Sequence, residues 1–223
     1  MACTLKSDDG LYSRININAI LLAAGSGSRM GHRPKSLLEL DDVPLIRRQL
    51  LALSEAGVDE VLVILGHYAN HIEDAIKGFP VRLVLNPDPD AGQVSSLRLG
   101  LQSVSAKLDA VLVALADQPL INSQDIKDLI CAYKNRPLNT HVVQPLVNGQ
   151  PGNPVMFSNE VRKQILLGDD NMGCRQWQLA HADQVHPWTS SNAHYCTDVD
   201  TLEDIAELTM RTGLQLKWPA HLI

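Results

Sequence analysis

The chain has 223 residues, of which 45% are hydrophobic and 20% charged, and its formal net charge at pH 7 is -6. One domain of this length buries a full core without disulfide or metal staples, and the negative charge excludes general affinity for nucleic acid or an anionic membrane. No stretch contains the roughly 20 consecutive apolar residues that a membrane-spanning helix needs. Residues 1–14 lack an apolar pattern and are predicted to be a flexible N-terminal extension, before a single domain over 15–214 and a C-terminal tail over 215–223.

The four cysteines are scattered along the chain, with neither CxxC spacing nor the density of a secreted disulfide scaffold. The start of the chain, MACTLKSDDG, is too polar for a signal peptide. Both features predict a protein of the reducing cytoplasm.

Four short apolar runs rich in Val, Leu, Ile and Ala predict strands at 17–25, 58–66, 81–87 and 109–119. Their nearly continuous apolar character is typical of parallel strands that helices cover on both faces. Helical spacing of apolar residues between the runs predicts helices at 43–57, 95–108 and 123–135. Strands that alternate with helices indicate right-handed βαβ units and a doubly wound α/β fold of three layers.

The second half of the chain is less regular. We predict, in chain order, two strands within 141–157, a helix near 158–167, a loop-rich stretch to about 192, a short strand at 194–198 and a helix at 201–212. Thr201 is the expected N-cap of the last helix, because Asp204 follows three residues later.

The loop after the first strand, AAGSGSRMGHRPK (23–35), is rich in glycine and serine. In open α/β sheets ligands bind at the carboxyl ends of the strands, and uncovered backbone N–H groups there can turn toward an anion. The glycine spacing fits neither GxGxxG nor GxxxxGK[ST]. Two separated cations, Arg29 and Lys35, suit a triphosphate spread along this loop.

The same string resembles the signature LAAGxSxRMGxxK of MobA-like NTP transferases, the nucleotidyltransferases related to molybdenum cofactor cytidylyltransferase. The resemblance runs from about residue 17 to 212. It implies a three-layer α/β/α Rossmann-like nucleotidyltransferase fold with a mostly parallel mixed sheet. It also implies that the nucleotide phosphates bind to Ala23, Ala24, Gly25, Ser26, Gly27, Arg29 and Lys35.

A triphosphate in a protein of negative net charge needs a counterion, usually Mg²⁺ held by one or two carboxylates. Asp117 of ADQP follows a buried strand, and in the resembling family this segment carries the metal-binding aspartate. TDVDTLEDI (197–205) resembles the family's DIDTPEDL, whose second aspartate corresponds to Asp200. Asp198 stays open as the alternative ligand, because residues two apart on a strand point to the same face.

The segment NPDPDAGQVSSLRLGL (86–101) resembles the family's GxxxSLxxGL pattern, which implies that Gly92 and Ser96 meet the base and ribose, with Ser95 as the alternative to Ser96. For the acceptor, GQPGNPV (149–155) resembles the GNPV loop, but Gln150 and Pro151 stand where a basic residue is frequent. Either another residue supplies that charge or the acceptor differs.

GDDNMGCRQW (168–177) is two residues longer than the family's GDxGxR element, which Arg175 would complete. The longer loop is read either as part of the acceptor site or as surface variation. Trp177 and Trp188 are expected to pack in the core or to line the acceptor pocket.

The resemblance implies transfer of CMP from CTP to a phosphorylated acceptor such as molybdopterin, with release of pyrophosphate and Mg²⁺ on Asp117 and Asp200. Lys35, Arg29 and Asp117 are the implied catalytic residues, and a molybdoenzyme is a candidate protein partner. The Ala23–Ala24 pair agrees with CTP as the donor.

Three other functions stay open: a sugar- or alditol-phosphate nucleotidyltransferase, a non-catalytic nucleotide-binding protein of molybdoenzyme maturation, and an NAD-dependent oxidoreductase. The missing GxGxxG motif argues against the oxidoreductase.

Overall fold

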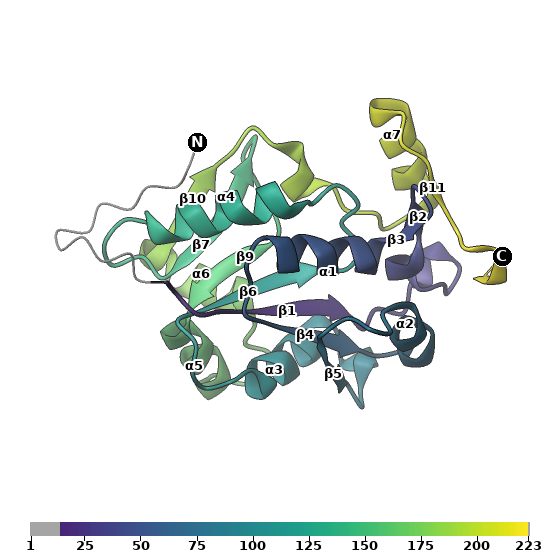
Figure 1. Cartoon of the computed structure of the whole chain (residues 1–223). Coiled ribbons are helices and arrows are strands. Elements are labelled where there is room, and N and C mark those ends of the chain that lie inside the picture. Colours follow the sequence, from purple (N-terminus) through teal and green to yellow (C-terminus); the bar gives the residue numbers. More distant parts are fainter. Residues whose placement is uncertain (1–13, 223) are drawn as a thin grey trace.

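A mixed eight-stranded sheet forms the middle layer of the computed structural model, which describes residues 14–222 (Figure 1). The predicted extension at 1–14 therefore lies almost wholly outside the described residues. The main strands are β1 (Ile17–Ala23), β4 (Glu60–Leu65), β5 (Arg82–Leu85), β6 (Ala110–Leu115), β7 (Val142–Val147), β9 (Val155–Ser158) and β10 (Val185–Thr189), and the short β8 (Gln150–Pro151) pairs with β7.

The strand order is β10-β7-β9-β6-β1-β4-β5. β1 pairs in parallel with β4 and β6, β4 with β5, and β10 with β7, whereas β9 runs antiparallel between β6 and β7. These strand directions confirm the mostly parallel mixed sheet that was predicted from the sequence. Its central strands are apolar because helices bury them on both sides.

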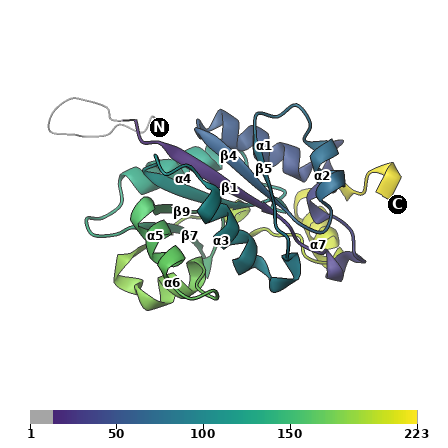
Figure 2. The same cartoon turned by 90° about the horizontal axis from the view of Figure 1, so that it is seen from below.

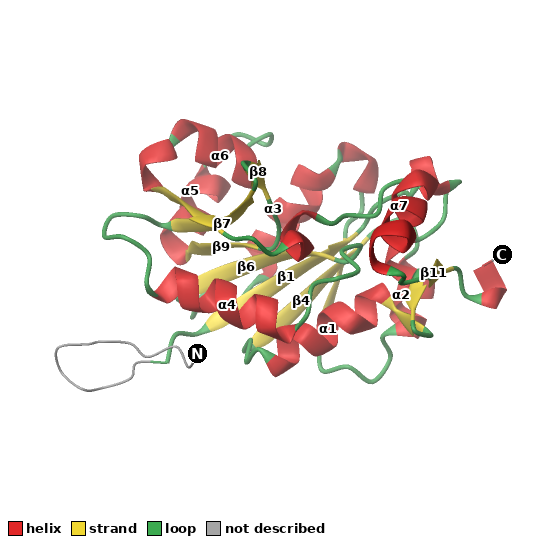
Figure 3. Ribbon diagram, turned by 90° about the horizontal axis from the view of Figure 1, so that it is seen from above, coloured by secondary structure: helices red, strands yellow, loops and turns green. Residues whose placement is uncertain are grey.

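Two layers of helices cover this sheet (Figures 2 and 3). Figure 3 shows α1 (Leu45–Glu55) and α4 (Ser123–Lys134) over one face, and their apolar residues share a core with β1 and with α2 (Ala69–Ala75). On the other face lie α3 (Gln93–Ser103), α5 (Asn159–Leu167) and α6 (Cys174–Ala180), which share a second core. No helix in the described part of the chain is long and apolar enough to cross a membrane.

The structure corrects the sequence reading of residues 168–198. The stretch read as loop contains α6 and the edge strand β10, whose Pro187 hides the strand pattern. The strand predicted at 194–198 is instead a short 3-10 helix, Ala193–Cys196. Local side-chain bonds stabilise this turn, because Asn192 accepts from the His194 N–H at 3.0 Å and Thr197 Oγ1 donates to the Ala193 carbonyl at 2.8 Å.

A second, three-stranded sheet stands beside the carboxyl edge of the first. It consists of β2 (Glu39–Leu40), β3 (Val43–Pro44) and β11 (Leu216–Lys217), and α7 (Leu202–Thr212) packs against it. Thr201 caps α7 in a box with Asp204, as predicted. β11 lies within the stretch predicted to be a tail; it belongs to the fold because Leu216 is 8% exposed and packs with Met30 and Leu40.

Candidate active site

The loop after β1 folds back on itself in a tight turn. The Gly27 carbonyl accepts from the N–H groups of Met30 at 2.8 Å and His32 at 3.0 Å. Gly27 has φ 59°, and a Cβ on it would lie 1.9 Å from the Arg33 carbonyl oxygen, so only glycine fits here. Buried Met30 anchors the turn in the small core under the second sheet. The loop that was predicted to hold phosphates is therefore fixed at the carboxyl edge of the central sheet.

Lys35 joins the three segments that the sequence analysis selected. Its Nζ lies 2.6 Å from Asp117 Oδ2, which follows β6, and 2.5 Å from Asp200 Oδ1, which precedes α7. The Lys35 side chain is 16% exposed. Arg29 Nη2 lies 2.8 Å from the second oxygen of Asp200. The two predicted metal ligands and the two predicted cations thus form one continuous ionic cluster.

The charges of this cluster shift the pKa values of its members. Burial lowers the pKa of Lys35, but Asp117 and Asp200 outweigh burial, so the pKa is raised overall. Burial raises the pKa of Asp200, but Lys35 and Arg29 outweigh it, so that pKa is lowered overall. For Asp198, burial and then the charge of Asp117 raise the pKa.

The structure places Asp198 and Asp200 on different partners. Asp200 binds Lys35 and Arg29, whereas Asp198 accepts a hydrogen bond from Gln118 Nε2 at 2.9 Å. Their segment is not a strand, so the two side chains are not constrained to one face. Asp200 therefore shares Lys35 with Asp117, whereas the hydrogen-bond partner of Asp198 is Gln118.

The donor set at this point suits a divalent ion. Over residues 14–222 there is no group of three or more His, Cys, Asp or Glu side chains arranged to hold a metal. Asp117 and Asp200 instead offer two hard carboxylate ligands beside a phosphate-type loop. That is the pattern of an ion such as Mg²⁺, which takes its remaining ligands from substrate phosphates and water.

The predicted base contact at Ser96 has an internal partner. Ser96 is 3% exposed, and its Oγ accepts from Asn86 Nδ2 at 2.9 Å. The same amide donates to Ser95 Oγ at 3.1 Å. Ser96 lines neither of the two cavities described below, and exposed Gly92, at φ 90°, forms the turn into α3. The serines hold the loop before α3 in place.

A cavity of about 800 Å³ shares the wall residue Leu22 with a smaller cavity at Lys35 and Asp117. Apolar side chains make up most of its wall, and the polar ones are Gln93, Gln144, Asn153, Arg175, Gln176 and Gln178. Arg175 is the one charged residue among the described residues that line it. The smaller cavity has a volume of about 40 Å³, and Gly25 also lines it. Neither Trp177 nor Trp188 lines the large cavity.

The long loop at 168–173 belongs to the architecture of this cavity. Arg98 of α3, with a side chain 11% exposed, donates to the carbonyls of Ile165 at 2.7 Å, Gly168 at 3.3 Å and Met172 at 3.3 Å. These bonds hold the loop against α3. Helix α6 follows the loop, and its Arg175 lines the cavity. The loop is therefore not mere surface variation.

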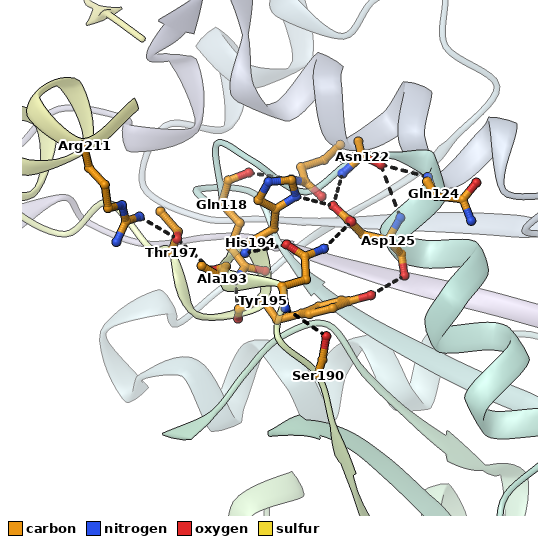
Figure 4. A network of polar contacts seen from close by, with 12 residues as sticks. Gln118, Asn122, Gln124, Asp125, Ser190, Ala193, His194, Tyr195, Thr197 and Arg211 are labelled. Carbon is orange, nitrogen blue, oxygen red and sulfur yellow. Dashed lines mark hydrogen bonds and ion pairs between the residues drawn. The ribbon is translucent and has the colours of Figure 1, made fainter. Parts of the chain in front are cut away.

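Sequence reasoning missed a buried polar network behind the site (Figure 4). Gln118 is 1% exposed, and its amide donates to the Tyr195 carbonyl at 3.2 Å and to Asp198. The side-chain carboxylate of Asp125, on α4, pairs with Asn192 and His194. The backbone carbonyl of Asp125 accepts a hydrogen bond from the Tyr195 hydroxyl at 2.7 Å. The one signal in the sequence is the position of Gln118, a polar residue directly after Asp117.

Comparison with known proteins places the chain in a family. Residues 19–185 match the model of the MobA-like NTP transferase domain. The chain belongs to this family. It therefore belongs among the nucleotidyltransferases, as the resemblance implied.

Individual relatives carry different activities. The nicotine blue oxidoreductase of Paenarthrobacter nicotinovorans is 31% identical over 198 residues, which is 86% of this chain and 96% of that protein. The bifunctional IPC transferase and DIPP synthase of Thermococcus kodakarensis is 36% identical over 92 residues, 40% of this chain. This match spans 21% of the length of that larger protein.

Solved structures share the fold. A nucleotidyl transferase from Methanothermobacter thermautotroptrophicus aligns with a TM-score of 0.72 at 26% identity, covering 88% of this chain and 97% of that one. A Mycobacterium tuberculosis protein in complex with manganese aligns with a TM-score of 0.68 at 24% identity, covering 86% of this chain and 97% of that one.

Proposed function

We propose that this protein transfers a nucleoside monophosphate from a nucleoside triphosphate to a phosphorylated small-molecule acceptor and releases pyrophosphate. The observation that carries the proposal is the ionic cluster, in which Lys35 lies between Asp117 and Asp200 beside the glycine loop. The Ala23–Ala24 pair favours CTP as the donor, and molybdopterin is the acceptor that the family resemblance favours. Mg²⁺ is the proposed metal.

The residues of the cluster have separate tasks in this mechanism. When bound to Asp117 and Asp200, a divalent ion supplies Lewis-acid polarisation of a phosphate oxygen. The backbone N–H groups around Gly25 and Gly27 bind the phosphates, and Arg29 and Lys35 balance the charge that develops on their oxygens. A phosphate acceptor is already ionised at neutral pH, so no protein nucleophile is required and positioning supplies most of the rate.

Arg175 is the proposed contact for the acceptor's anionic group. The GNPV loop lacks the basic residue that is frequent before it in the family, since Gln150 and Pro151 stand at that place. Arg175 lines the same cavity as Asn153 of that loop and brings a positive charge from α6. A guanidinium binds a phosphate with two parallel hydrogen bonds, which also fixes its orientation.

The test is pyrophosphate release with CTP, GTP or ATP, Mg²⁺ and phosphorylated acceptors, for the wild type and the variants Asp117→Asn and Asp200→Asn. Each variant is expected to lose at least about 100-fold in kcat/KM, because it removes a ligand that acts on the transition-state charge. The matched control is Glu160→Gln, an exposed carboxylate on α5, which should keep wild-type activity. Wild-type turnover by Asp117→Asn would refute the assignment.

A second candidate is reduction of an organic acceptor, which is favoured by one observation, the nearly full-length relative named nicotine blue oxidoreductase. The same protein preparation should therefore be incubated with NADH or NADPH and nicotine blue. Consumption of the reduced nicotinamide, without pyrophosphate release from any triphosphate, would favour this candidate. Binding of CTP with neither reaction would favour a non-catalytic role in molybdoenzyme maturation.

A further inference from the structure

Three loops of the site meet at one buried carbonyl group. The Tyr195 carbonyl accepts from the Asn153 N–H of the GNPV loop at 2.8 Å and from Gln118 Nε2 at 3.2 Å. Gly152 permits this approach, since a Cβ on it would lie 2.7 Å from the same oxygen. Tyr195 and Gln118 are each 1% exposed. The segment that leads to Asp200 is thereby bound to the loop that carries Asp117.

The second hydrogen of the Gln118 amide completes this link. A side-chain amide nitrogen donates two hydrogen bonds, and the other acceptor here is Asp198 Oδ1 at 2.9 Å. One amide therefore joins the neighbour of Asp117 to a residue two places before Asp200. The backbone of Gln118 is held separately, because its carbonyl accepts from buried Gln49 Nε2 at 2.6 Å.

We propose that Gln118 and Asp198 are positioning residues that set the spacing between Asp117 and Asp200, and that Asp198 is not a metal ligand. This inference rests on the proposed metal site. Mg²⁺ requires oxygen ligands at close to 2.1 Å in nearly octahedral geometry, so a small shift of one carboxylate weakens binding. Partners that orient ligands are typically worth about 10- to 100-fold in metal affinity.

The experiment is Mn²⁺ binding to the full chain, measured by the electron paramagnetic resonance of free Mn²⁺, independently of activity. Gln118→Leu removes both amide bonds at nearly constant volume, and we expect its Kd to rise about 10- to 100-fold. The matched control is Gln49→Leu, which removes a bond of the same kind to the same loop but none to residues 195–198. Its Kd should stay close to that of the wild type.

A second pair of variants changes Asp198 in place of the fully buried Gln118. Asp198→Asn keeps an oxygen that can accept from Gln118, whereas Asp198→Ala does not. Because both remove the same charge, the difference between them isolates the hydrogen bond, and we expect Asp198→Ala to bind Mn²⁺ about 10-fold more weakly than Asp198→Asn. Asp200→Asn should bind more weakly than Asp198→Asn.

Each outcome decides the role of these residues. Equal affinities of the two Asp198 variants, equal losses in Gln118→Leu and Gln49→Leu, or a loss in Asp198→Asn as large as in Asp200→Asn would overturn the positioning role alone. Absence of Mn²⁺ binding by the wild type would overturn the proposed metal site and the positioning role with it.

Discussion

At the scale of single residues, Lys35 balances the charges of the site. It is a largely buried ammonium with carboxylates on two sides, so removing it takes away the ion pair of Asp117 and leaves Asp200 with Arg29 alone. The lowered pKa of Asp200 shows that the folded state favours its charged form, and the raised pKa of Lys35 shows the same for the ammonium. The cluster therefore stabilises the fold as well as preparing the site.

Lys35→Met is expected to lower the free energy of unfolding by about 1–3 kcal/mol at pH 7 and to reduce turnover. The Asp200 contribution is present above its ordinary pKa of 3.8 and is lost as pH falls through the folded value. The Lys35 contribution is present below 10.5 and is lost as pH rises through its raised value. Urea unfolding should therefore show the full deficit at neutral pH and a smaller one below about pH 4. A deficit that grows on acidification would contradict this account.

At the scale of elements, the N-terminus of α4 holds the stretch of chain that precedes Asp200. The Asp125 side chain is 5% exposed, and it accepts from the Asn122 N–H at 3.0 Å, Asn192 Nδ2 at 2.7 Å and His194 Nδ1 at 2.9 Å. These bonds, with the Tyr195 hydroxyl on the Asp125 carbonyl, join one helix to the 3-10 turn at 193–196 (Figure 4).

Asp125→Ala should lower the free energy of unfolding by about 2–4 kcal/mol, because it leaves several hydrogen-bond donors around a buried site without an acceptor. Chemical denaturation measures this loss. Asp128→Ala, an exposed aspartate one turn further along α4, is the control and should change stability by less than about 0.5 kcal/mol. A similar loss in both variants would mean that helix charge, rather than the network, is responsible.

At the scale of the whole molecule, three separate hydrophobic cores stabilise the fold. Two lie on opposite faces of the central sheet, and the third lies under the second sheet, where Met30, Leu38, Leu40, Leu208 and Leu216 pack together. This third core joins the glycine loop after β1 to α7 and to the C-terminal strand β11. Leu216, near the C-terminal end of the chain, therefore packs in the same core as Met30 of the loop.

Leu216→Ala is expected to destabilise the protein by about 2–4 kcal/mol and to weaken CTP binding, because Met30 of the glycine loop loses packing. Calorimetry of unfolding and of nucleotide binding measures the two effects. Leu167→Ala, at a side chain 86% exposed, provides the control and should alter neither. If stability falls but CTP affinity is unchanged, the third core does not support the loop.

The sequence by itself determined the local features of this protein. Continuous apolar runs predicted the central strands β1, β4 and β6, because strands covered on both faces need apolar residues throughout. The run at 81–87 also predicted β5, but this strand lies at the edge of the sheet and its Leu85 is 60% exposed. The glycine loop, the Thr201 cap and the aspartate after β6 were likewise readable, since each depends on residues close together in the chain. The edge strand β10 and helix α6 were not, because short segments without regular alternation carry a weak pattern.

Only the tertiary structure decided which distant side chains of the site contact one another. Lys35 and Asp200 lie 165 residues apart, and Gln118 and Asp198 lie 80 apart, so no local pattern distinguishes Asp200 from Asp198. The same holds for Arg175, which reaches the cavity because Arg98 on another helix holds its loop. Hydrogen bonds and charges depend on distance in space, and folding sets that distance for residues that the sequence keeps far apart.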